Sequence, residues 1–463
     1  MAALDELTTP AGDGDTVCGV RARLVAAPAD TAEAAALIRA AQGLSVVIRG
    51  GGTKLDWGPP PRELDLIIDT RRLSGVVEHA AGDLITVVKA GTPMSELHGL
   101  PGQQLALDAP AGATAGGTVA ANASGPRRLR YGTARDLLIG ITVVRPDGTV
   151  TKAGGKVVKN VAGYDLGKLY TGAFGTLGLI TECVFRLHPA PAAAAFVRAV
   201  APPGQAAKIL AGQFAASALE VNAAPGAEPE LAVLVEGTPA GVRERAAAIA
   251  ALLDGEVSEQ APDWWDVSPW PDGGVGIKLT GRLSQVPALV ATAVGAGATV
   301  RGSAGAGVLY AGFPAPNPSP GPATTGIGPS SPGPASSSAT STSASDSSPT
   351  AGSTGTGTSS PAAVSTGAGR SSPVSSSAST VSPVVGPGTG TAEGTVEAGR
   401  AIELLRAAAV RAGGHAVVLT APAGVRETLD MWGPVPGLAL MRRVKDQFDP
   451  DHRFAPGRFV GGI

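Results

Sequence analysis

Residues 110–125 read PAGATAGGTVAANASG, a stretch in which glycine and alanine are interspersed with hydroxyl and amide side chains. Glycine allows main-chain N–H groups to approach a bound ligand closely. Thr114, Asn122 and Ser124 can form hydrogen bonds beside that main chain. The stretch therefore predicts that a flat or phosphorylated ligand lies along the backbone.

Two other glycine-rich segments lie on either side of this stretch. RGGGTK at residues 49–54 follows the β-type run SVVI and predicts a nest of N–H groups for phosphate oxygens. NVAGYDL at residues 160–166 is followed by GAFGTLGLITE at 172–182, where glycines run into a β-branched strand and leave main chain open to a ligand ring. Because the chain contains 65 glycines, an ordinary glycine-rich turn remains the alternative for each segment alone.

The common nucleotide-binding motifs are absent from the sequence. The spacing from Gly163 to Lys168 is wrong for a phosphate-binding loop of the G-x-x-x-x-G-K-[ST] type, and Leu169 follows the lysine. No G-x-G-x-x-G lies between a predicted strand and a predicted helix. The ligand of the glycine-rich segments is therefore not expected to sit in a Rossmann fold.

Charge and composition narrow the class of protein further. The formal net charge is −2, from 36 basic and 38 acidic residues in 463, so the overall charge favours neither nucleic acid nor an anionic membrane as partner. Two cysteines, Cys18 and Cys183, cannot supply the four thiolates of an iron–sulfur cluster and do not indicate a disulfide framework. The sequence has no signal-peptide pattern and no apolar run long enough to span a bilayer, so we expect a cytoplasmic protein.

Helix and strand signals divide the chain into an α+β part and a split α/β part. In the first part, a helix is expected from Ala34 to Ala41, after a capping box formed by Asp30 and Glu33. Strands are expected there at 44–48, 64–69, 75–79, 85–90, 139–145 and 177–187. In the second part, strands are expected at 231–236, 308–313 and 415–420, with helices at 240–253 and 396–412.

Residues 314–392 interrupt the second part. They consist mainly of Ser, Thr, Pro, Gly and Ala and contain no aromatic residue, so they cannot bury enough apolar area to offset the entropy of ordering. We therefore expect a disordered insert. The expected divisions are an N-terminal tail (1–19), a ligand-binding domain (20–195), a second domain in two parts (196–313 and 393–463) and the insert (314–392).

The order of the three glycine-rich segments resembles the FAD-binding domain of vanillyl-alcohol-oxidase-like (PCMH-type) flavoproteins. Residues 440–458, with LMRRVK, FDP and PGR in that order, are similar to the C-terminal ending of the same group. Within it, the chain is most similar to the FAD-binding E-type subunit of bacterial glycolate oxidase. The resemblance is strong over residues 20–190, weaker over the remainder, and does not include the insert.

This resemblance implies a two-part PCMH-type FAD-binding domain and a smaller α/β cap domain, the latter interrupted by the insert. It implies that FAD is bound without a covalent link, because relatives with covalent flavin carry a histidine in the first loop, where this chain has Thr53 and Lys54. It further implies an FAD-binding subunit of a glycolate oxidase/dehydrogenase-type complex, which oxidises a 2-hydroxy acid or relays its electrons. The implied partners are a catalytic flavoprotein subunit and an iron–sulfur subunit, through which membrane association would arise.

The residues that match cofactor contacts of the family lie in all three segments. Those matching the loop at the FAD pyrophosphate are Gly50, Gly51, Gly52 and Thr53. Those matching the second loop, against the diphosphate and flavin, are Pro110, Gly112, Thr114, Gly116, Gly117, Asn122, Ser124 and Gly125. Those matching a strand beside the cofactor are Gly175, Gly178, Ile180 and Glu182, and Tyr164 and Asp165 match a segment near the flavin.

Catalytic D-2-hydroxyacid dehydrogenases of the group carry a C-terminal histidine- and acid-rich segment for metal and substrate, which this sequence lacks. Its histidines are His79, His98, His188, His415 and His452, and no two have metal-ligand spacing, so no metal site is expected. Two further hypotheses therefore stay open. The chain could be a self-sufficient FAD-dependent alcohol or hydroxyacid oxidase, or a scaffold subunit that binds FAD without doing chemistry.

Three clusters outside these segments have both a structural and a functional interpretation. Trp264, Trp265 and Trp270, with Asp263 and Asp266, are expected to pack a core, with a substrate or partner surface as the alternative. Arginines at 127, 128, 130 and 135 are each expected on a solvated face. Arg442, Arg443 and Lys445 either hold a carboxylate or complement the end of a helix.

Overall fold

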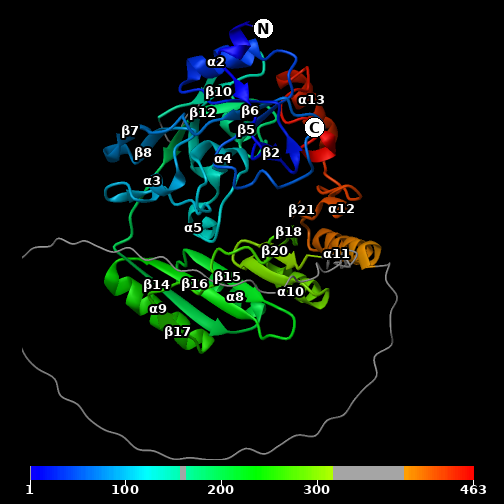
Figure 1. The fold of residues 1–463 in the computed structure, drawn as a ribbon. Coiled ribbons are helices and arrows are strands. Elements are labelled where there is room, and N and C mark those ends of the chain that lie inside the picture. The colour runs from blue at the N-terminus through cyan, green and yellow to red at the C-terminus, as the bar shows by residue number, and fades with distance from the viewer. Residues whose placement is uncertain (1, 157–162, 316–389) are drawn as a thin grey trace, which may run out of the picture. The chain divides into compact units, whose positions relative to one another are not determined.

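The computed structural model describes residues 2–156, 163–315 and 390–463, whose elements are labelled in Figure 1. The described residues form a first region (9–189 and 438–463) with two larger sheets, and a second region (193–315 and 390–432) built on one large sheet. None of the described helices is long and apolar enough to cross a membrane.

The first sheet of the first region has parallel pairing at its centre. The helix α2 (Thr31–Ala40) connects two of its strands, and the carboxylate of Asp30 accepts the predicted hydrogen bond from the Glu33 N–H. The Glu33 carboxylate accepts from the Ala29 N–H instead of the Asp30 N–H. Leu37 and Ile38 of α2 are buried against the sheet. The strand order is β1 (Thr9–Pro10), β4 (Leu24–Ala26), β6 (Leu66–Asp69) and β5 (Val46–Arg49).

The second sheet of the first region is antiparallel throughout. A tight turn at Asp147-Gly148 joins two of its strands, and Gly148 has a φ of +77°, a left-handed conformation that glycine adopts without strain. The four strands predicted between residues 75 and 187 are confirmed as members of this sheet. The strand order is β11 (Val150–Gly154), β10 (Leu138–Val144), β12 (Leu179–Arg186), β8 (Ile85–Lys89) and β7 (Val76–Ala80).

The second region contains an eight-stranded antiparallel sheet, which is larger than the sequence predicted. Its strand order is β17 (Glu256–Ser258), β14 (Ala193–Val200), β16 (Glu230–Gly237), β15 (Ala218–Ala223), β19 (Thr299–Ser303), β20 (Val308–Phe313), β18 (Val275–Thr280) and β21 (Ala416–Thr420). Only β16, β20 and β21 match expected strands. Four of the others escaped prediction because alanine or glycine within them weakens the β signal, and β17 has only three residues.

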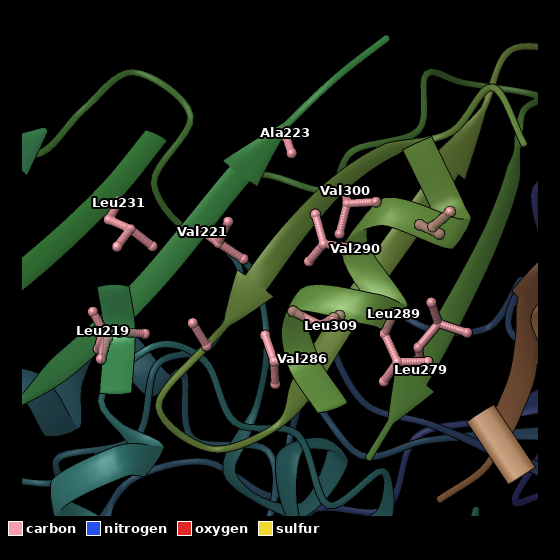
Figure 2. Packing of buried hydrophobic residues seen from close by; sticks show 14 of the residues in the cluster. Leu219, Val221, Ala223, Leu231, Leu279, Val286, Leu289, Val290, Val300 and Leu309 are labelled. Atoms are coloured by element: carbon pink, nitrogen blue, oxygen red, sulfur yellow. The ribbon is translucent and has the colours of Figure 1, made fainter. Parts of the chain in front are cut away.

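Helices cover one face of this sheet. The helices α9 (Pro239–Leu253), α10 (Val286–Gly295) and α11 (Gly390–Arg411) share one apolar core with the strands. Figure 2 shows Leu219 and Val221 of β15, Leu309 of β20 and the α10 residues Val286 and Leu289 in this core. Apolar residues alternate along the strands, so every second side chain points to the opposite face.

The second region is formed by sequence on both sides of residues 316–389, which lie outside the described residues. The strand β21 pairs with β18, so the sheet is completed by residues that follow the gap. The helix α11 begins at Gly390, six residues earlier than the expected helix and inside the range expected for the insert. Glycine and threonine at its start resemble the composition of the insert and conceal the helix boundary in the sequence.

Candidate functional site

A cavity in the first region is lined by all three glycine-rich segments. It encloses about 850 Å³ of empty space, part of it open to solvent. Its walls come from the loop after β5, from α4 (Ala115–Ala120) and the loop before it, and from residues 174–180 at the start of β12. Arg458, from the C-terminal segment, also lines it. We call it the first cavity.

Glycine is required where the first two loops meet. A Cβ atom on Gly50 would lie 2.3 Å from the Thr114 hydroxyl oxygen, and one on Gly51 would lie 1.7 Å from the Gly112 carbonyl oxygen. Both distances are far shorter than a non-bonded carbon–oxygen contact, so a side chain at Gly50 would displace the Thr114 hydroxyl and one at Gly51 would force the main chain to shift. The glycines of RGGGTK therefore bring two main-chain segments together at the wall of the first cavity.

The strand before this loop is fixed by ion pairs. Arg49, the last residue of β5, donates from Nε and Nη2 to the Asp69 carboxylate, at 3.1 and 3.0 Å, and from Nη1 to Asp15 at 2.7 Å. The Asp69 side chain is nearly inaccessible to solvent, and its bonds to Arg71 and Arg49 outweigh the cost of burial and lower its pKa. This network holds the end of β5 where the glycine loop begins.

The third segment packs against α4. Phe174 donates its N–H to the Ala120 carbonyl at 2.9 Å and has a φ of +54°, which is uncommon for a residue with a side chain. Gly175 and Gly178 line the first cavity, with Gly178 at a φ of +158° and a Cβ position only 2.8 Å from Val143 Cγ1. Main chain rather than side chain therefore forms much of this wall.

The C-terminal segment completes the first cavity. The guanidinium of Arg458 donates to the carbonyl oxygens of Leu55, Trp57 and Pro59, at 2.9, 3.0 and 3.2 Å. The ammonium of Lys445, in α13 (Leu438–Phe448), donates to the Asp449 carboxylate at 2.6 Å and to the carbonyls of Thr176 and Phe454. The predicted C-terminal pattern thus anchors this segment through Lys445 and Asp449 and places Arg458 against the loop after β5.

The chemistry of the first cavity fits a ligand with a diphosphate and flat rings. Main-chain groups and the hydroxyls of Thr53, Thr114 and Thr118 line it. The Thr118 hydroxyl is buried, and no group of the described residues forms a hydrogen bond with it. Because buried polar atoms are normally satisfied, this hydroxyl indicates a missing ligand contact. The residues present therefore fit FAD.

A second cavity of about 1000 Å³ shares Lys54 and Ala121 with the first. The end of the second glycine-rich loop forms part of its wall, and strands of the eight-stranded sheet form another part. Its charged lining residues are the cations Lys54, Arg128, Lys278 and Arg301 and the acids Asp108, Glu220 and Asp266. Such a concentration of charged groups is unusual for a packing defect and indicates a polar ligand.

Strand register explains how these charged residues come together. Lys278 of β18 is paired with Tyr310 of β20, which is paired with Arg301 of β19. Glu220 and Ser303 are also direct cross-strand partners, on β15 and β19. Side chains at opposed positions point to the same face, so these residues occupy the face opposite the apolar core of Figure 2.

Lys54 and Asp266 titrate away from their ordinary ranges. Burial lowers the pKa of Lys54 to about 8, and the Asp266 charge opposes this shift. Asp266 is accessible within the second cavity, but partial desolvation raises its pKa to about 6, and the neighbouring Asp108 adds to the effect. Both groups can therefore change charge near neutral pH where the two cavities meet.

The structure brings most of the predicted site residues to the two cavities. Those lining the first cavity are Gly50, Gly51, Gly52, Thr53, Thr114, Gly116, Gly117, Gly175, Gly178 and Ile180. Those lining the second are Pro110, Asn122, Ser124 and Gly125. Gly112, Tyr164, Asp165 and Glu182 line neither. Tyr164 is 91% exposed, and Glu182 accepts a hydrogen bond from Thr142 within the second sheet. Three residues of the third segment, Asn160, Val161 and Ala162, lie outside the described residues.

Several functional candidates were missed or left undecided by the sequence. No motif marks Glu220, Lys278 or Arg301; the available signal is a single charged residue within each short strand. The tryptophan cluster serves both as packing and as a ligand-facing surface. Trp264 and Trp270 line the second cavity, whereas Trp265 packs edge-on against Phe196.

The remaining basic residues and histidines lie away from the two cavities. Arg442 and Arg443 are exposed, and His452 faces Asp446 at 2.8 Å. Within residues 2–156, 163–315 and 390–463, no three His, Cys, Asp or Glu side chains are arranged to hold a metal ion.

Comparison with known proteins identifies the class to which this site belongs. Residues 22–154 match the family described as an FAD binding domain. A solved structure of alkyldihydroxyacetonephosphate synthase has a TM-score of 0.57 at 14% identity, covering 94% of this chain and 76% of the other, and so shares the fold. Residues 22–154 are therefore an FAD-binding domain, and the cofactor of the chain is FAD.

Among curated proteins, the chain is similar to oxidases and dehydrogenases of 2-hydroxy acids. Glycolate oxidase subunit GlcE of Escherichia coli is 35% identical over 159 residues, 33% of this chain and 45% of that protein. D-lactate dehydrogenase of Archaeoglobus fulgidus is 34% identical over 179 residues, 36% of this chain and 39% of the relative. D-2-hydroxyglutarate dehydrogenase of Xanthomonas citri pv. viticola is 33% identical over 174 residues, 36% and 37% of the two chains. Each match spans less than half of the relative's length.

Proposed function

We propose that this chain is an FAD-dependent oxidoreductase that acts on small 2-hydroxy acids as the FAD-binding subunit of a glycolate oxidase/dehydrogenase-type complex. The observation that carries the proposal is the junction of the two cavities. A main-chain-lined cavity suited to a dinucleotide shares Lys54 and Ala121 with a cavity lined by four cations. The names of the relatives support the same substrate class.

The chain's own residues have distinct tasks in this proposal. Glycines of the three segments and Arg458 hold FAD without a covalent link, and the eight-stranded sheet belongs to a cap domain that supplies the substrate side. When bound, the flavin supplies the acceptor for a hydride equivalent from the substrate carbon. Lys278, Arg128 and Arg301 attract and orient the substrate carboxylate.

The proposed partners are a catalytic flavoprotein subunit and an iron–sulfur subunit, in the cytoplasm or at a membrane through those partners. With two cysteines the chain cannot bind a four-thiolate cluster itself, so electrons leaving its flavin need another carrier. The similarity to a glycolate oxidase subunit supports this assignment. A self-sufficient oxidase and a non-catalytic FAD-binding scaffold are the alternatives to be separated by experiment.

The test begins with an absorbance spectrum of the purified full-length chain, followed by anaerobic addition of glycolate or D-lactate. Flavin bands that bleach with substrate would favour the self-sufficient enzyme. Bands that stay oxidised alone but bleach in the presence of the partner subunits would support the subunit role, and bands that never bleach would identify a scaffold. Folded protein that takes up no added FAD would contradict the proposal altogether.

A further inference from the structure

Glu220 and Ser303 form a pair of unsatisfied polar groups at the wall of the second cavity. The two residues are direct cross-strand neighbours on β15 and β19. Both are buried, with 6% and 2% of their surface exposed, and both line the cavity. Among the described residues, neither Glu220 Oε1 nor Ser303 Oγ has a hydrogen-bond partner at normal distance and angle, although the two residues are neighbours. Buried polar atoms without partners in a cavity wall indicate contacts that a ligand completes.

The groups around this pair define the charge of the ligand. Lys278 lies on β18, two strands from Ser303 in the same sheet, and Arg301 is two residues before Ser303 on β19. Arg128 is held by the carbonyls of Ser124 and Gly125 and lies 3.3 Å from the Tyr310 hydroxyl. These three cations on the walls of the second cavity favour an anionic ligand, and planar guanidinium groups suit a carboxylate.

An ionised Glu220 would repel that ligand. A neutral carboxylic acid at the same position would instead donate a hydrogen bond from its O–H, and such bonds to a carboxylate are short and strong. We infer that Glu220 is a neutral acid that donates a hydrogen bond to a small organic carboxylate held by Lys278 and Arg128 in the second cavity. The inference rests on the proposed function, because it concerns the substrate side of the same site.

The electrostatic surroundings of Glu220 agree with this assignment. Burial raises the pKa of Glu220 to about 8; the charge of Arg128 and the neighbouring Ser303 hydroxyl oppose this shift, whereas the charges of Asp266 and Asp108 add to it. A bound carboxylate adds another negative charge and raises the pKa further, so ligand binding and protonation of Glu220 become linked. The linkage predicts proton uptake on binding above pH 8 and little uptake at pH 7.

Other groups that face the second cavity also titrate and must be separated from Glu220. The pKa of Lys54 is lowered to about 8, that of Asp266 is raised to about 6, and burial lowers the pKa of Lys278. Loss of a proton from either lysine would also weaken anion binding at high pH. Glu220→Gln resolves this ambiguity, because glutamine keeps a donor at the position but has no charge to titrate.

The test is isothermal titration calorimetry of the FAD-loaded full-length protein with 2-hydroxyisobutyrate. This 2-hydroxy acid has no hydrogen on its C2 atom, so it binds without being oxidised. We expect binding to weaken about tenfold from pH 7 to pH 9, with about one proton taken up at pH 9 in buffers of different ionisation enthalpy. Glu220→Gln should bind with nearly the same affinity at both pH values, whereas Glu228→Gln, at an exposed position of the β15–β16 connection, should behave as wild type.

Each outcome tests a different part of the assignment. No proton uptake by the wild type, or the same weakening at pH 9 in Glu220→Gln, would overturn the role of Glu220 and transfer the pH dependence to the lysines. Failure of the wild type to bind the probe at pH 7 would contradict the carboxylate substrate class itself. Unchanged FAD content and a single cooperative melting transition of Glu220→Gln confirm that the variant is folded.

Discussion

Gly51 and Gly112 meet so closely that a Cβ atom on Gly51 would lie 1.7 Å from the Gly112 carbonyl oxygen. Gly51 and Gly112 are 61 positions apart in the sequence. The backbones of the two glycine-rich segments that contain them are nevertheless in direct contact at the first cavity. Part of the glycine content therefore serves to bring main chain against main chain. The space left beside this contact is where the cofactor is proposed to lie.

Gly51→Ala should destabilise the fold. The added methyl group meets a carbonyl rather than a movable side chain, so one of the two loops must shift, at a cost of about 1–3 kcal/mol in the free energy of unfolding. Urea unfolding followed by tryptophan fluorescence measures the change. Gly14→Ala is the control, because no atom lies within 4 Å of its Cβ position. Equal stability of the two variants would contradict the close contact.

Gly117→Val should abolish FAD retention while leaving the protein folded. The Gly117 Cβ position meets only the Thr114 hydroxyl oxygen, at 3.1 Å, and Gly117 lines the first cavity, so the valine side chain would occupy ligand space. The ratio of flavin to protein absorbance, with a melting temperature as folding control, tests this. Normal FAD content in the folded variant would count against the placement of the second loop at the cofactor.

Lys445→Met should be strongly destabilising. Lys445 and Asp449 are 1% and 0% exposed, and removal of the ammonium leaves a buried carboxylate without its counter-charge, which costs about 3–5 kcal/mol. Arg443→Met, an exposed position on the same helix, is the matched control. Urea unfolding of both variants measures the difference, and a loss no larger than that of the control would show that the ion pair does not anchor the C-terminal segment.

Glu220→Gln should change how stability depends on pH. The folded protein holds a proton on Glu220 up to about pH 8, whereas an unfolded glutamic acid loses it near pH 4–5, so wild-type stability falls as pH rises between these values. The slope is at most about 1.4 kcal/mol per pH unit. Relative to wild type, the variant should therefore gain stability from pH 5 to pH 9 in urea unfolding. A constant difference across this range would indicate that Glu220 is not buried as a neutral acid.

Deletion of residues 316–389, with a short Gly/Ser linker in their place, should leave FAD binding intact. The elements on both sides, β20 and α11, belong to the core of the second region, and loop-closure entropy changes slowly with loop length. The deletion stops before Gly390, because α11 begins there. The flavin spectrum and FAD content of the shortened chain provide the measurement, and loss of flavin would assign the segment a part in cofactor binding.

The sequence alone determined the local features of this protein. The capping box at Asp30 and Glu33, the turn at Gly148 and the glycine-rich segments depend on interactions among near neighbours, whose preferences are visible in short stretches of sequence. The same local patterns carried the resemblance to FAD-binding flavoproteins that the comparisons confirmed.

Tertiary structure decided which distant residues meet. Nothing in their spacing indicates that Glu220 opposes Ser303, or that Lys278 and Arg301 both flank Tyr310, because strand register is set by pairing across a sheet assembled from separate parts of the chain. The approach of Gly51 to Gly112 and the delivery of Arg458 to the loop after β5 depend in the same way on packing. The cofactor class was therefore visible in the sequence, whereas the charged second cavity emerged only from the fold.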